Sequence, residues 1–462
     1  MCANIKEGEK TIGEILENLS EEAELEEFEE RVNRSQIMKP FSFIHTADLH
    51  LDSPFKGISE VSGEISLELT EATFKAFNKI INLCIEKQVN FLLIAGDIYN
   101  GTDRSLRAQL RFRDGLKRLS EAGIKAYIVH GNHDPLDGWS ANLDWPKNVH
   151  IFGRKPVERV PVEKDGEEIA QIYGISFHTR EIKTNLTYKF PKISPSKKAL
   201  FTIGMLHCNV GSNTGHESYA PCTLQDLISR NFDYWALGHV HKKAIINDDN
   251  PLVIYPGNPQ GLHPKETGAR GCFLINVNEN GEPTAEFIEV DSIRWFVEEL
   301  SIDSLYTEQE LISQIHNCIE KIREEAEGRS SVCRIILTGR SALHSSIARK
   351  GVLDDILKDT REDEEGEKQF VWIESIGDNT NPEIDRKSLL EREDFIGDLV
   401  KLFEEFSHNE TKIAELKESL EPLFTSPGGR KLLEPIDDEY FLDLIKKAET
   451  LCLDKLVGGE IS

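Results

Sequence analysis

The sequence predicts an α/β fold in which two sheets form a sandwich flanked by helices, followed by a small α+β domain and a C-terminal helical region. From residue 41 onward, short apolar runs alternate with helical segments, which is typical of a sheet with parallel neighbouring strands. Strand-like runs then continue with less helix between them, which indicates a second sheet packed on the first. The pattern changes again after about residue 296, and 462 residues exceed what one ordinary core needs.

Residues 1–38 are expected to be a mobile, acidic N-terminal extension. Glutamates are frequent there, and apolar residues recur only at a loose helical period with little aromatic bulk. We therefore expect no packed core in this segment.

Residues 39–296 are expected to hold both sheets. The first half of this region alternates strand and helix, with helices predicted near 66–88 and 103–122. The strands are predicted in the runs FSFIHTADLH, NFLLIAGD, KAYIVHGNHD, NVHIFG, AQIYGISF, ALFTIGMLHC, YWALGHVH, PLVIYPGN and GCFLINV. In parallel sheets of this kind, ligands bind outside the carboxyl ends of the strands, so those ends are the first place to look for a site.

Residues 297–380 are predicted to form the small α+β domain, and residues 381–462 the helical region. The small domain reads as the strands FVEELSI, RIILTG and FVWIESI with helices near 307–325 and 343–358. In the helical region, one side of a helix carries the apolar residues Phe395, Leu399, Leu402 and Phe403.

The net charge of -27 is unevenly distributed. Residues 1–37 carry -7 and residues 351–462 carry -16, so residues 38–350 carry only -4. A nearly neutral central region does not exclude a polyanionic ligand there.

Membrane and secreted classes are disfavoured. No apolar stretch approaches the roughly 20 residues of a membrane helix, and glutamates replace the basic start and apolar centre of a signal peptide. The eight cysteines are scattered singly and form no Cys-x-x-Cys pair. We expect a cytoplasmic protein with reduced thiols and no membrane contact.

Five apolar runs end in an aspartate, an asparagine or a histidine at the point where a strand would stop. Two of these ends carry a pair of such residues two positions apart, and in an extended chain such pairs point to one side. The five ends could therefore converge around a shared centre. The residues are Asp48, His50, Asp97, Asn132, His133, His207, His239 and His241.

Carboxylate, imidazole and amide oxygen ligands together suit manganese, iron or zinc, and the absence of thiolates argues against a structural zinc cage. Asp97 is the natural bridge between two ions, because its carboxylate has two oxygens and Gly96 lets the backbone approach closely. Two ions about 3.5–4 Å apart can activate a water and clamp both sides of an in-line displacement at phosphorus.

The ordered motifs Asp-x-His, Gly-Asp, Gly-Asn-His-Asp, His and Gly-His-x-His resemble those of the calcineurin-like metallophosphoesterases. More narrowly, the stretches FIHTADLHLDSPF, YIVHGNHDP, WALGHVHKK and YPGNPQGLHPKETGARGC are similar to DNA repair exonucleases of the SbcD and YhaO type. The resemblance covers about residues 41–340. It implies a two-sheet metallophosphoesterase sandwich that hydrolyses phosphodiester bonds in DNA by a two-metal mechanism, with a capping domain after residue 296.

The resemblance also implies the roles of individual residues, with two divalent ions, preferably Mn²⁺, as cofactors. His133 would bind no metal and would protonate the departing 3′ oxygen, a step typically worth about 10²–10⁴ in rate. Asn100 stands where family members often carry an aspartate or histidine, and an asparagine cannot stabilise an imidazolium by charge. One ion would be held by Asp48, His50, Asp97 and His241, and the other by Asp97, Asn132, His207 and His239.

A DNA-binding surface is expected beside this site. Arg104, Arg107 and Arg111 recur at helical spacing after Asp97, and Lys242 and Lys243 follow His241 directly. The blander interpretation of the arginines is a solvated helix face. We expect contacts with the DNA backbone and strand ends, with little sequence preference.

The family resemblance further implies protein partners. Relatives act with an ATPase of the SbcC or Rad-fifty type, or with YhaN in the YhaO branch, and a homodimer is also expected. The apolar face of the C-terminal helices could bind such an ATPase, although a packing role for this face is an equal alternative.

Two other functions remain open from the sequence. The first is a phosphodiesterase or phosphatase for a small nucleotide, and the second is a non-catalytic interaction module on the same fold. A protein phosphatase is disfavoured because its Asp-Arg-Gly motif is absent after Gly96-Asp97. The isolated His45, His130 and His150 are expected to be structural residues.

Overall fold

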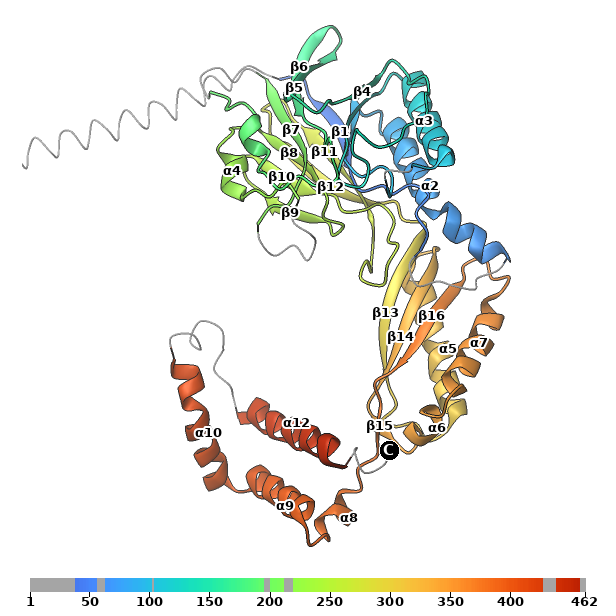
Figure 1. The fold of residues 1–462 in the computed structure, drawn as a ribbon, viewed down its shortest axis with the longest axis vertical. Helices are drawn as coiled ribbons and strands as arrows, with labels where there is room; N and C mark the ends of the chain where they lie inside the picture. Colours follow the sequence, from blue (N-terminus) through green and yellow to red (C-terminus); the bar gives the residue numbers. More distant parts are fainter. Residues whose placement is uncertain are drawn as a thin grey trace, which may run out of the picture. The chain divides into compact units, whose positions relative to one another are not determined.

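The computed structural model describes residues 38–55, 63–101, 104–194, 200–211, 219–426 and 438–457 (Figure 1). Except for residue 38, the predicted acidic extension lies outside these residues. The chain divides into two compact units. Unit 1 comprises Met1–Val297, Lys321–Cys333 and Glu364–Glu374, and unit 2 comprises Glu298–Glu320, Arg334–Asp363 and Ser375–Ser462.

The first sheet of unit 1 has six strands in the order β12-β11-β1-β2-β3-β4. Strands β1 to β4 run parallel, and β11 pairs antiparallel with both β1 and β12. The four parallel strands therefore end at one edge of the sheet. The strands are β1 Phe41–Thr46, β2 Phe91–Ala95, β3 Lys125–Val129, β4 Val149–Ile151, β11 Gly271–Val277 and β12 Pro283–Glu289.

The second sheet has six strands in the order β5-β6-β7-β8-β10-β9. Its central strands β6, β7, β8 and β10 are parallel, whereas β5 and β9 are antiparallel edge strands. The strands are β5 Glu158–Lys164, β6 Glu167–Gly174, β7 Phe201–His207, β8 Tyr234–Gly238, β9 Ala244–Asn247 and β10 Leu252–Tyr255. The predicted two-sheet α/β sandwich is confirmed (Figure 1).

The first sheet is apolar on both faces because each face is covered. Alternate residues of a strand point to opposite sides, so Leu92 and Ile94 of β2 join the core beneath the helices α2 (Gly63–Glu86) and α3 (Leu106–Glu121). Phe91 and Leu93 join the core between the two sheets. This two-sided burial explains why β2 reads as an uninterrupted apolar run.

Aromatic packing joins the two sheets. The rings of Phe43 and Phe91 stack at 4.9 Å, and Tyr234 of the second sheet meets Phe43 edge-on at 5.2 Å. All three side chains are fully buried. Their contacts fix the two sheets in register, which positions the strand ends of both sheets.

The helices of unit 1 begin and end close to the predicted positions. The sequence pattern placed α3 at 103–122, and the helix spans Leu106–Glu121 because Ser105 caps it, accepting a hydrogen bond from Ala108 N. The outer face of the second sheet carries shorter pieces, namely the 3₁₀ turn η1 (Thr187–Lys189) and α4 (Leu224–Ile228).

A three-stranded sheet follows, in the order β13-β14-β16, together with the short pair β15-β17. The α+β character expected after residue 296 is therefore present. The elements are β13 Ile293–Ser301, α5 Glu308–Glu325, β14 Ser330–Thr338, β15 Arg340–Ser341, α6 His344–Ile347, α7 Val352–Glu364, β16 Val371–Asp378 and β17 Asn381–Pro382.

The C-terminal part of unit 2 is helical, as predicted. Ile396 and Val400 of α9 are buried with Leu453 of α12, whereas Phe395 is 68% and Leu402 is 42% exposed. Among the described residues, no helix is long and apolar enough to cross a membrane. The helices are α8 Arg386–Leu390, α9 Phe395–His408, α10 Glu410–Thr425 and α12 Asp438–Val457.

Removing the ring of Phe43 is expected to destabilise unit 1 strongly. Phe43→Ala leaves a cavity between the sheets, and we expect a loss of about 3–5 kcal/mol in the free energy of unfolding. Chemical denaturation followed by tryptophan fluorescence measures this loss, because Trp235 is buried in the second sheet. Phe395→Ala, which removes an exposed ring, is the control and should cost less than about 0.5 kcal/mol. Equal costs would contradict the proposed role of the inter-sheet core.

Candidate metal centre

The candidate site lies where five parallel strands end. Strands β1, β2 and β3 are neighbours in the first sheet, and β7 and β8 are neighbours in the second. The polar residues singled out in the sequence occupy the last position of β7 or the loops directly after the other four strands.

These residues form two clusters of side chains that could each hold a cation. Within each cluster the ligand atoms lie within 4.8 Å of one another. Every member is buried except His241, which is partly exposed. The first cluster is Asp48, His50 and His241, and the second is Asp97, His207 and His239.

Hydrogen-bonding distances connect the two clusters. The backbone N–H of His239 donates to both carboxylate oxygens of Asp48, at 3.0 and 3.1 Å. Asn132 Oδ1 lies 3.0 Å from His207 Nε2 and 3.1 Å from His239 Nδ1. Asp97 Oδ2 lies 3.3 Å from His207 Nε2. The structure thus brings all seven predicted ligand side chains to one place.

The chemistry of these atoms fits two divalent cations. His50 Nε2 faces His241 Nε2 at 3.1 Å, and at most one of these nitrogens can donate to the other. His50 Nδ1 is buried and has no hydrogen-bond partner among the residues that the structure describes. A buried ring nitrogen without a hydrogen-bond partner is costly, and a bound cation would offset that cost. Carboxylate, imidazole and amide oxygen donors suit Mn²⁺, Fe²⁺ or Zn²⁺.

The backbone of the site is strained. Asp48, His50, Asp97 and His239 have φ values of 53°, 43°, 52° and 99°, in the left-handed region that non-glycine residues rarely adopt. Such strain costs about 1–3 kcal/mol per residue and collects at functional sites. Two loop hydrogen bonds hold it in place, from Asp48 N to Gly96 O at 3.0 Å and from His50 N to Asp97 O at 3.1 Å.

Gly96 and Gly238 permit the close approach of the strands. A Cβ atom at either position would overlap the ring of His207, and at Gly238 it would also overlap the carbonyl oxygen of Ala95. Gly96 moreover has φ +99°, which favours glycine. The glycines that precede Asp97 and His239 are therefore required for space.

Burial and mutual charge shift the pKa values of the clustered groups. Burial raises the pKa of Asp48 to about 6, against the opposing charges of His207 and His241. For His207, burial lowers the pKa, but the Asp97 and Asp48 carboxylates and the hydrogen bond to Ala95 together raise it to about 9. Burial and the neighbouring His241 lower the pKa of His50 to about 3. Because cation ligands must be deprotonated, we expect metal binding here to release protons.

His133 lies beside the two clusters and belongs to neither. Its backbone N–H donates to Asp97 Oδ1 at 2.9 Å, and its ring meets His50 edge-on with centroids 5.0 Å apart. Its side chain is only partly buried. Asn100, the residue that departs from the family pattern, is exposed just after β2.

Two carboxylates in the site have roles that the sequence did not assign. Glu266 Oε1 lies 2.6 Å from His241 Nδ1. Burial raises the pKa of Glu266, but the hydrogen bond and charge of His241, with smaller contributions from Leu262 N and Arg270, lower it to about 2. Asp134 accepts from Gly131 N and Ile98 N, both at 2.8 Å, and so joins the loops after β2 and β3. Asp134 belongs to the recognised GNHD motif and Glu266 to HPKETG, but nothing in the motifs indicates these contacts.

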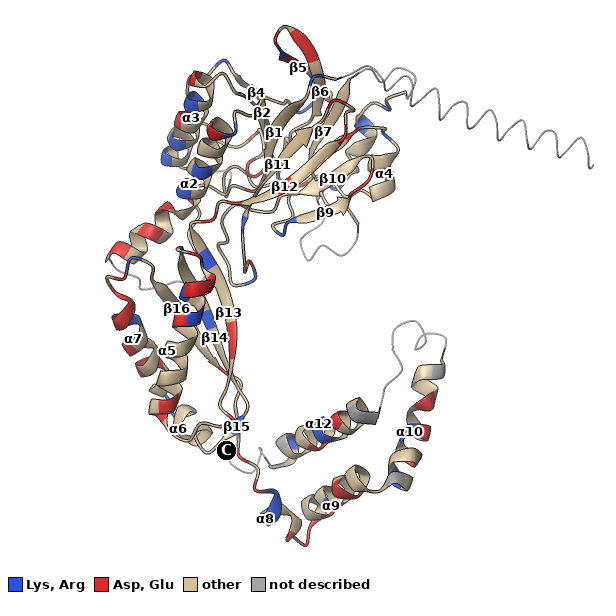
Figure 2. Ribbon diagram, turned by 180° about the vertical axis from the view of Figure 1, so that it is seen from behind, with Lys and Arg blue, Asp and Glu red and all other residues tan. Residues whose placement is uncertain are grey.

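The arginines that were expected to form a basic stripe are held by contacts within the chain. Arg104 is buried and donates to the carbonyl oxygens of Asp134 and Pro135, at 2.8 and 2.6 Å, so it is not part of an exposed stripe. Arg107 pairs with Asp52 and Glu71, and Arg111 also pairs with Glu71. Figure 2 shows that basic residues recur along α3.

The remaining cations and histidines differ in exposure. Lys242 and Lys243 are exposed, and Lys243 Nζ lies 3.6 Å from the ring centroid of Phe287. His45 bonds Tyr234 at 2.9 Å, His130 lies 3.1 Å from Asp134, and His150 lies 3.0 Å from Glu158. These three histidines make contacts that are consistent with a structural role.

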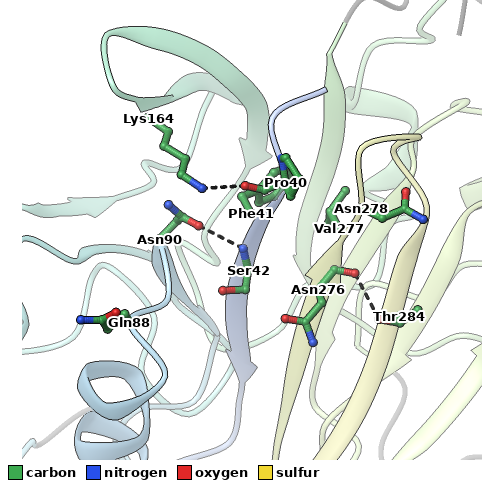
Figure 3. A pocket seen from close by; sticks show the side chains of 10 residues that line it. All are labelled: Pro40, Phe41, Ser42, Gln88, Asn90, Lys164, Asn276, Val277, Asn278 and Thr284. Atoms are coloured by element: carbon green, nitrogen blue, oxygen red, sulfur yellow. Dashed lines mark hydrogen bonds between the residues drawn. The ribbon is translucent and has the colours of Figure 1, made fainter. Parts of the chain in front are cut away.

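A polar pocket of about 470 Å³ lies at the other end of the first sheet (Figure 3). It is lined by the beginning of β1 and the end of β11, about a strand's length from the metal ligands. Its polar groups bond one another: Lys164 Nζ donates to Pro40 O at 2.6 Å, and Ser42 N donates to Asn90 Oδ1 at 3.0 Å. The clusters at the strand ends are therefore the stronger candidate for function.

Comparison with known families agrees with this geometry. The family described as Calcineurin-like phosphoesterase matches residues 41–243, and the family described as Metallophosphoesterase YhaO, middle domain, matches residues 295–381. The chain belongs to the calcineurin-like metallophosphoesterases. Within that class it belongs to the group that includes YhaO and SbcD.

Three relatives illustrate the range of similarity. The metallophosphoesterase YhaO of Bacillus subtilis is 35% identical, over 90% of this chain and 98% of that protein. The DNA double-strand break repair protein Mre11 of Sulfurisphaera tokodaii is 25% identical, over 66% of this chain and 75% of its own length. A component of the nuclease SbcCD of Bacillus subtilis is 22% identical, over 54% of this chain and 71% of its own length.

Binding of Mn²⁺ is expected to stabilise unit 1. A ligand at 100 times its Kd stabilises a protein by about 2.7 kcal/mol, so the unfolding temperature after treatment with a chelator should rise when Mn²⁺ is restored. Asp97→Asn should abolish most of that rise, because it removes the negative charge of a candidate ligand that lies beside His207 and His133. Differential scanning calorimetry provides the measurement. Asp114→Asn, on the exposed face of α3, is the matched control and should respond as the wild type does. An unchanged Mn²⁺ response in Asp97→Asn would count against the site.

Proposed function

We propose that this chain is a dinuclear-metal phosphodiesterase that cleaves DNA. The observation that carries the proposal is the convergence of two ligand clusters, linked by the hydrogen bonds from His239 N to Asp48, at the carboxyl ends of five strands. The relatives named for DNA double-strand break repair and as part of a nuclease support DNA as the substrate.

In this proposal, Asp97 would help to hold both ions, with Mn²⁺ preferred. Two such ions supply Lewis-acid activation of the phosphodiester and of the attacking water. The protein holds the ligands rigid through strained loops and excludes bulk water from the buried carboxylates. One ion is assigned to Asp48, His50, Asp97 and His241, and the other to Asp97, Asn132, His207 and His239.

His133 is assigned as the general acid that protonates the departing 3′ oxygen. Its backbone is tied to Asp97 Oδ1 at 2.9 Å, so its position follows that of the shared carboxylate. Its ring is partly exposed, which leaves it accessible to a leaving group. A positioned acid of this kind typically contributes about 10²–10⁴ in rate.

Residues 297–380 are assigned as a capping domain, and the C-terminal helices as the binding surface for an ATPase of the SbcC, Rad-fifty or YhaN type. The exposed Phe395 and Leu402 of α9 support the second assignment. A homodimer belongs to the same proposal. A location in the cytoplasm also belongs to the proposal.

A small-nucleotide phosphodiesterase is the second candidate. Arg104 is buried, and Arg107 and Arg111 are paired with carboxylates, so α3 offers less free positive charge than the sequence suggested. This observation weakens the case for a DNA track on α3 but leaves the hydrolytic centre unchanged. A non-catalytic module on the same fold would show no turnover on either kind of substrate.

Cleavage of DNA with Mn²⁺ tests the function directly. Wild-type protein incubated with end-labelled duplex and single-stranded DNA should produce shortened or nicked products on sequencing gels. His133→Ala should lower the rate by about 10²–10⁴ while Mn²⁺ binding persists. His150→Ala is the matched control, because His150 pairs with Glu158 and lies outside both clusters. Absence of cleavage by the wild type, or an unchanged rate in His133→Ala, would refute the proposal or the role of the acid, respectively.

Substitution of two arginines of α3 distinguishes the two candidate substrate classes. Arg107→Ala combined with Arg111→Ala should lower DNA cleavage by about tenfold at moderate salt, because each cation near a phosphate adds to affinity. Hydrolysis of bis(p-nitrophenyl) phosphate should stay within twofold of the wild type, because this substrate has no extended backbone. Lys117→Ala, at an exposed position of the same helix, is the control for a general charge effect. Equal losses on both substrates would mean that the arginines only support the fold through Glu71 and Asp52.

A further inference from the structure

Glu266 is bonded directly to one of the candidate metal ligands. Glu266 Oε1 lies 2.6 Å from His241 Nδ1, and both side chains are mostly buried, at 15% and 23% exposure. The other ring nitrogen, His241 Nε2, points toward His50 Nε2 at 3.1 Å. A carboxylate that accepts a hydrogen bond from Nδ1–H leaves Nε2 with a free lone pair.

Glu266 is itself held in place from its other side. Its Oε2 accepts hydrogen bonds from Leu262 N at 2.7 Å and from Asn258 Nδ2 at 3.0 Å. Arg270 donates to Asn258 Oδ1 at 2.8 Å and also to the carbonyl oxygen of His241. The loop between β10 and β11 therefore binds His241 at both its backbone and its ring.

Two other candidate ligand histidines are held differently. His207 Nδ1 is bonded to the carbonyl oxygen of Ala95 at 2.9 Å, a neutral acceptor within the sandwich. His50 Nδ1 finds no partner among the described residues. In the cluster of Asp48, His50 and His241, the carboxylate of Glu266 is thus the outer group that orients an imidazole.

We propose that Glu266 is a positioning residue that fixes the tautomer of His241. It keeps the ring hydrogen on Nδ1, so that Nε2 is available to the ion held with Asp48 and His50. This inference rests on the two-ion site of the proposed function. Partners that orient ligand histidines are typically worth about 10–100-fold in metal affinity. Glu266 acts through His241 and does not touch the reacting atoms.

The hydrogen bonds around Glu266 make Glu266→Gln a sharp test. Two donors, Leu262 N and Asn258 Nδ2, converge on Oε2, whereas one ring nitrogen faces Oε1. A glutamine will turn its single amide oxygen toward the two donors, which leaves its NH₂ group against His241 Nδ1. That NH₂ donates, so Nδ1 becomes the acceptor and Nε2 carries the hydrogen. The substitution preserves shape yet should block the ligand atom.

Isothermal titration of chelator-treated protein with Mn²⁺, in the absence of any substrate, measures the effect. Wild type should bind two ions, and Glu266→Gln should weaken one of them by about 10–100-fold while leaving the other near its original affinity. Glu286→Gln, at an exposed position of β12, is the matched control. Binding of both ions by Glu266→Gln as in the wild type would overturn the inference and leave the proposed function standing.

A second measurement does not depend on metal. In chelator-treated protein labelled with ¹⁵N-histidine, the His241 signals, assigned by their loss in His241→Asn, should report Nδ1–H in the wild type and Nε2–H in Glu266→Gln. An unchanged pattern would overturn the inference even if the wild type bound no Mn²⁺, an outcome that would separately refute the two-ion site. Should Glu266→Gln fail to fold by circular dichroism, Glu266→Asp replaces it. Its shorter side chain cannot contact Leu262 N and His241 Nδ1 at the same time. We therefore expect weaker binding of one ion, with a smaller loss of affinity than in Glu266→Gln.

Discussion

The contact between Asp97 and His207 is the constraint on which the rest of the structure depends. Asp97 follows β2 of the first sheet, His207 ends β7 of the second, and their side chains meet at 3.3 Å. The carboxyl ends of both sheets must therefore approach closely, which requires glycine at Gly96 and Gly238. The aromatic packing around Phe43 keeps the sheets in that arrangement, so the core positions the site as well as stabilising the fold.

The centre is costly to build, and the cost explains the surrounding network. Left-handed backbone at the ligand positions, buried carboxylates and facing ring nitrogens all oppose folding. The structure offsets these costs locally, through loop hydrogen bonds such as Asp48 N to Gly96 O and through Asp134, which joins two of the loops. Violations of local preference that gather in one place are typical of a functional site. Cation binding would offset part of this cost by giving the buried carboxylates and ring nitrogens a positively charged partner.

The sequence predicted the sandwich and the strand-end residues because both follow local rules. Apolar runs mark parallel strands, and a polar residue after such a run lies at a known edge of the sheet. The partners of these residues could not be predicted in the same way. Glu266 contacts His241 from a loop that is distant in the sequence. The pairing of Arg107 of α3 with Glu71 of α2 depends on how these two helices pack. The sequence pattern placed Arg104 in a surface stripe, but its side chain is buried and donates hydrogen bonds to the carbonyl oxygens of Asp134 and Pro135.

Electrostatics couple the candidate ions to any anionic substrate. Asp48, Asp97 and Glu266 place three carboxylates within or directly beside the clusters, while Arg107 and Arg111 of α3 are paired with Asp52 and Glu71. A phosphodiester approaching this centre without cations would meet net negative charge at short range, in surroundings where charges are weakly screened. Two divalent ions outweigh these three carboxylates and reverse the sign of the local field. Because Arg107 and Arg111 are already paired with carboxylates, we expect the affinity for an anionic substrate to depend strongly on metal loading. Under the proposed function, metal binding and substrate binding would be linked, so a residue that sets metal affinity, as proposed for Glu266, would also influence substrate affinity.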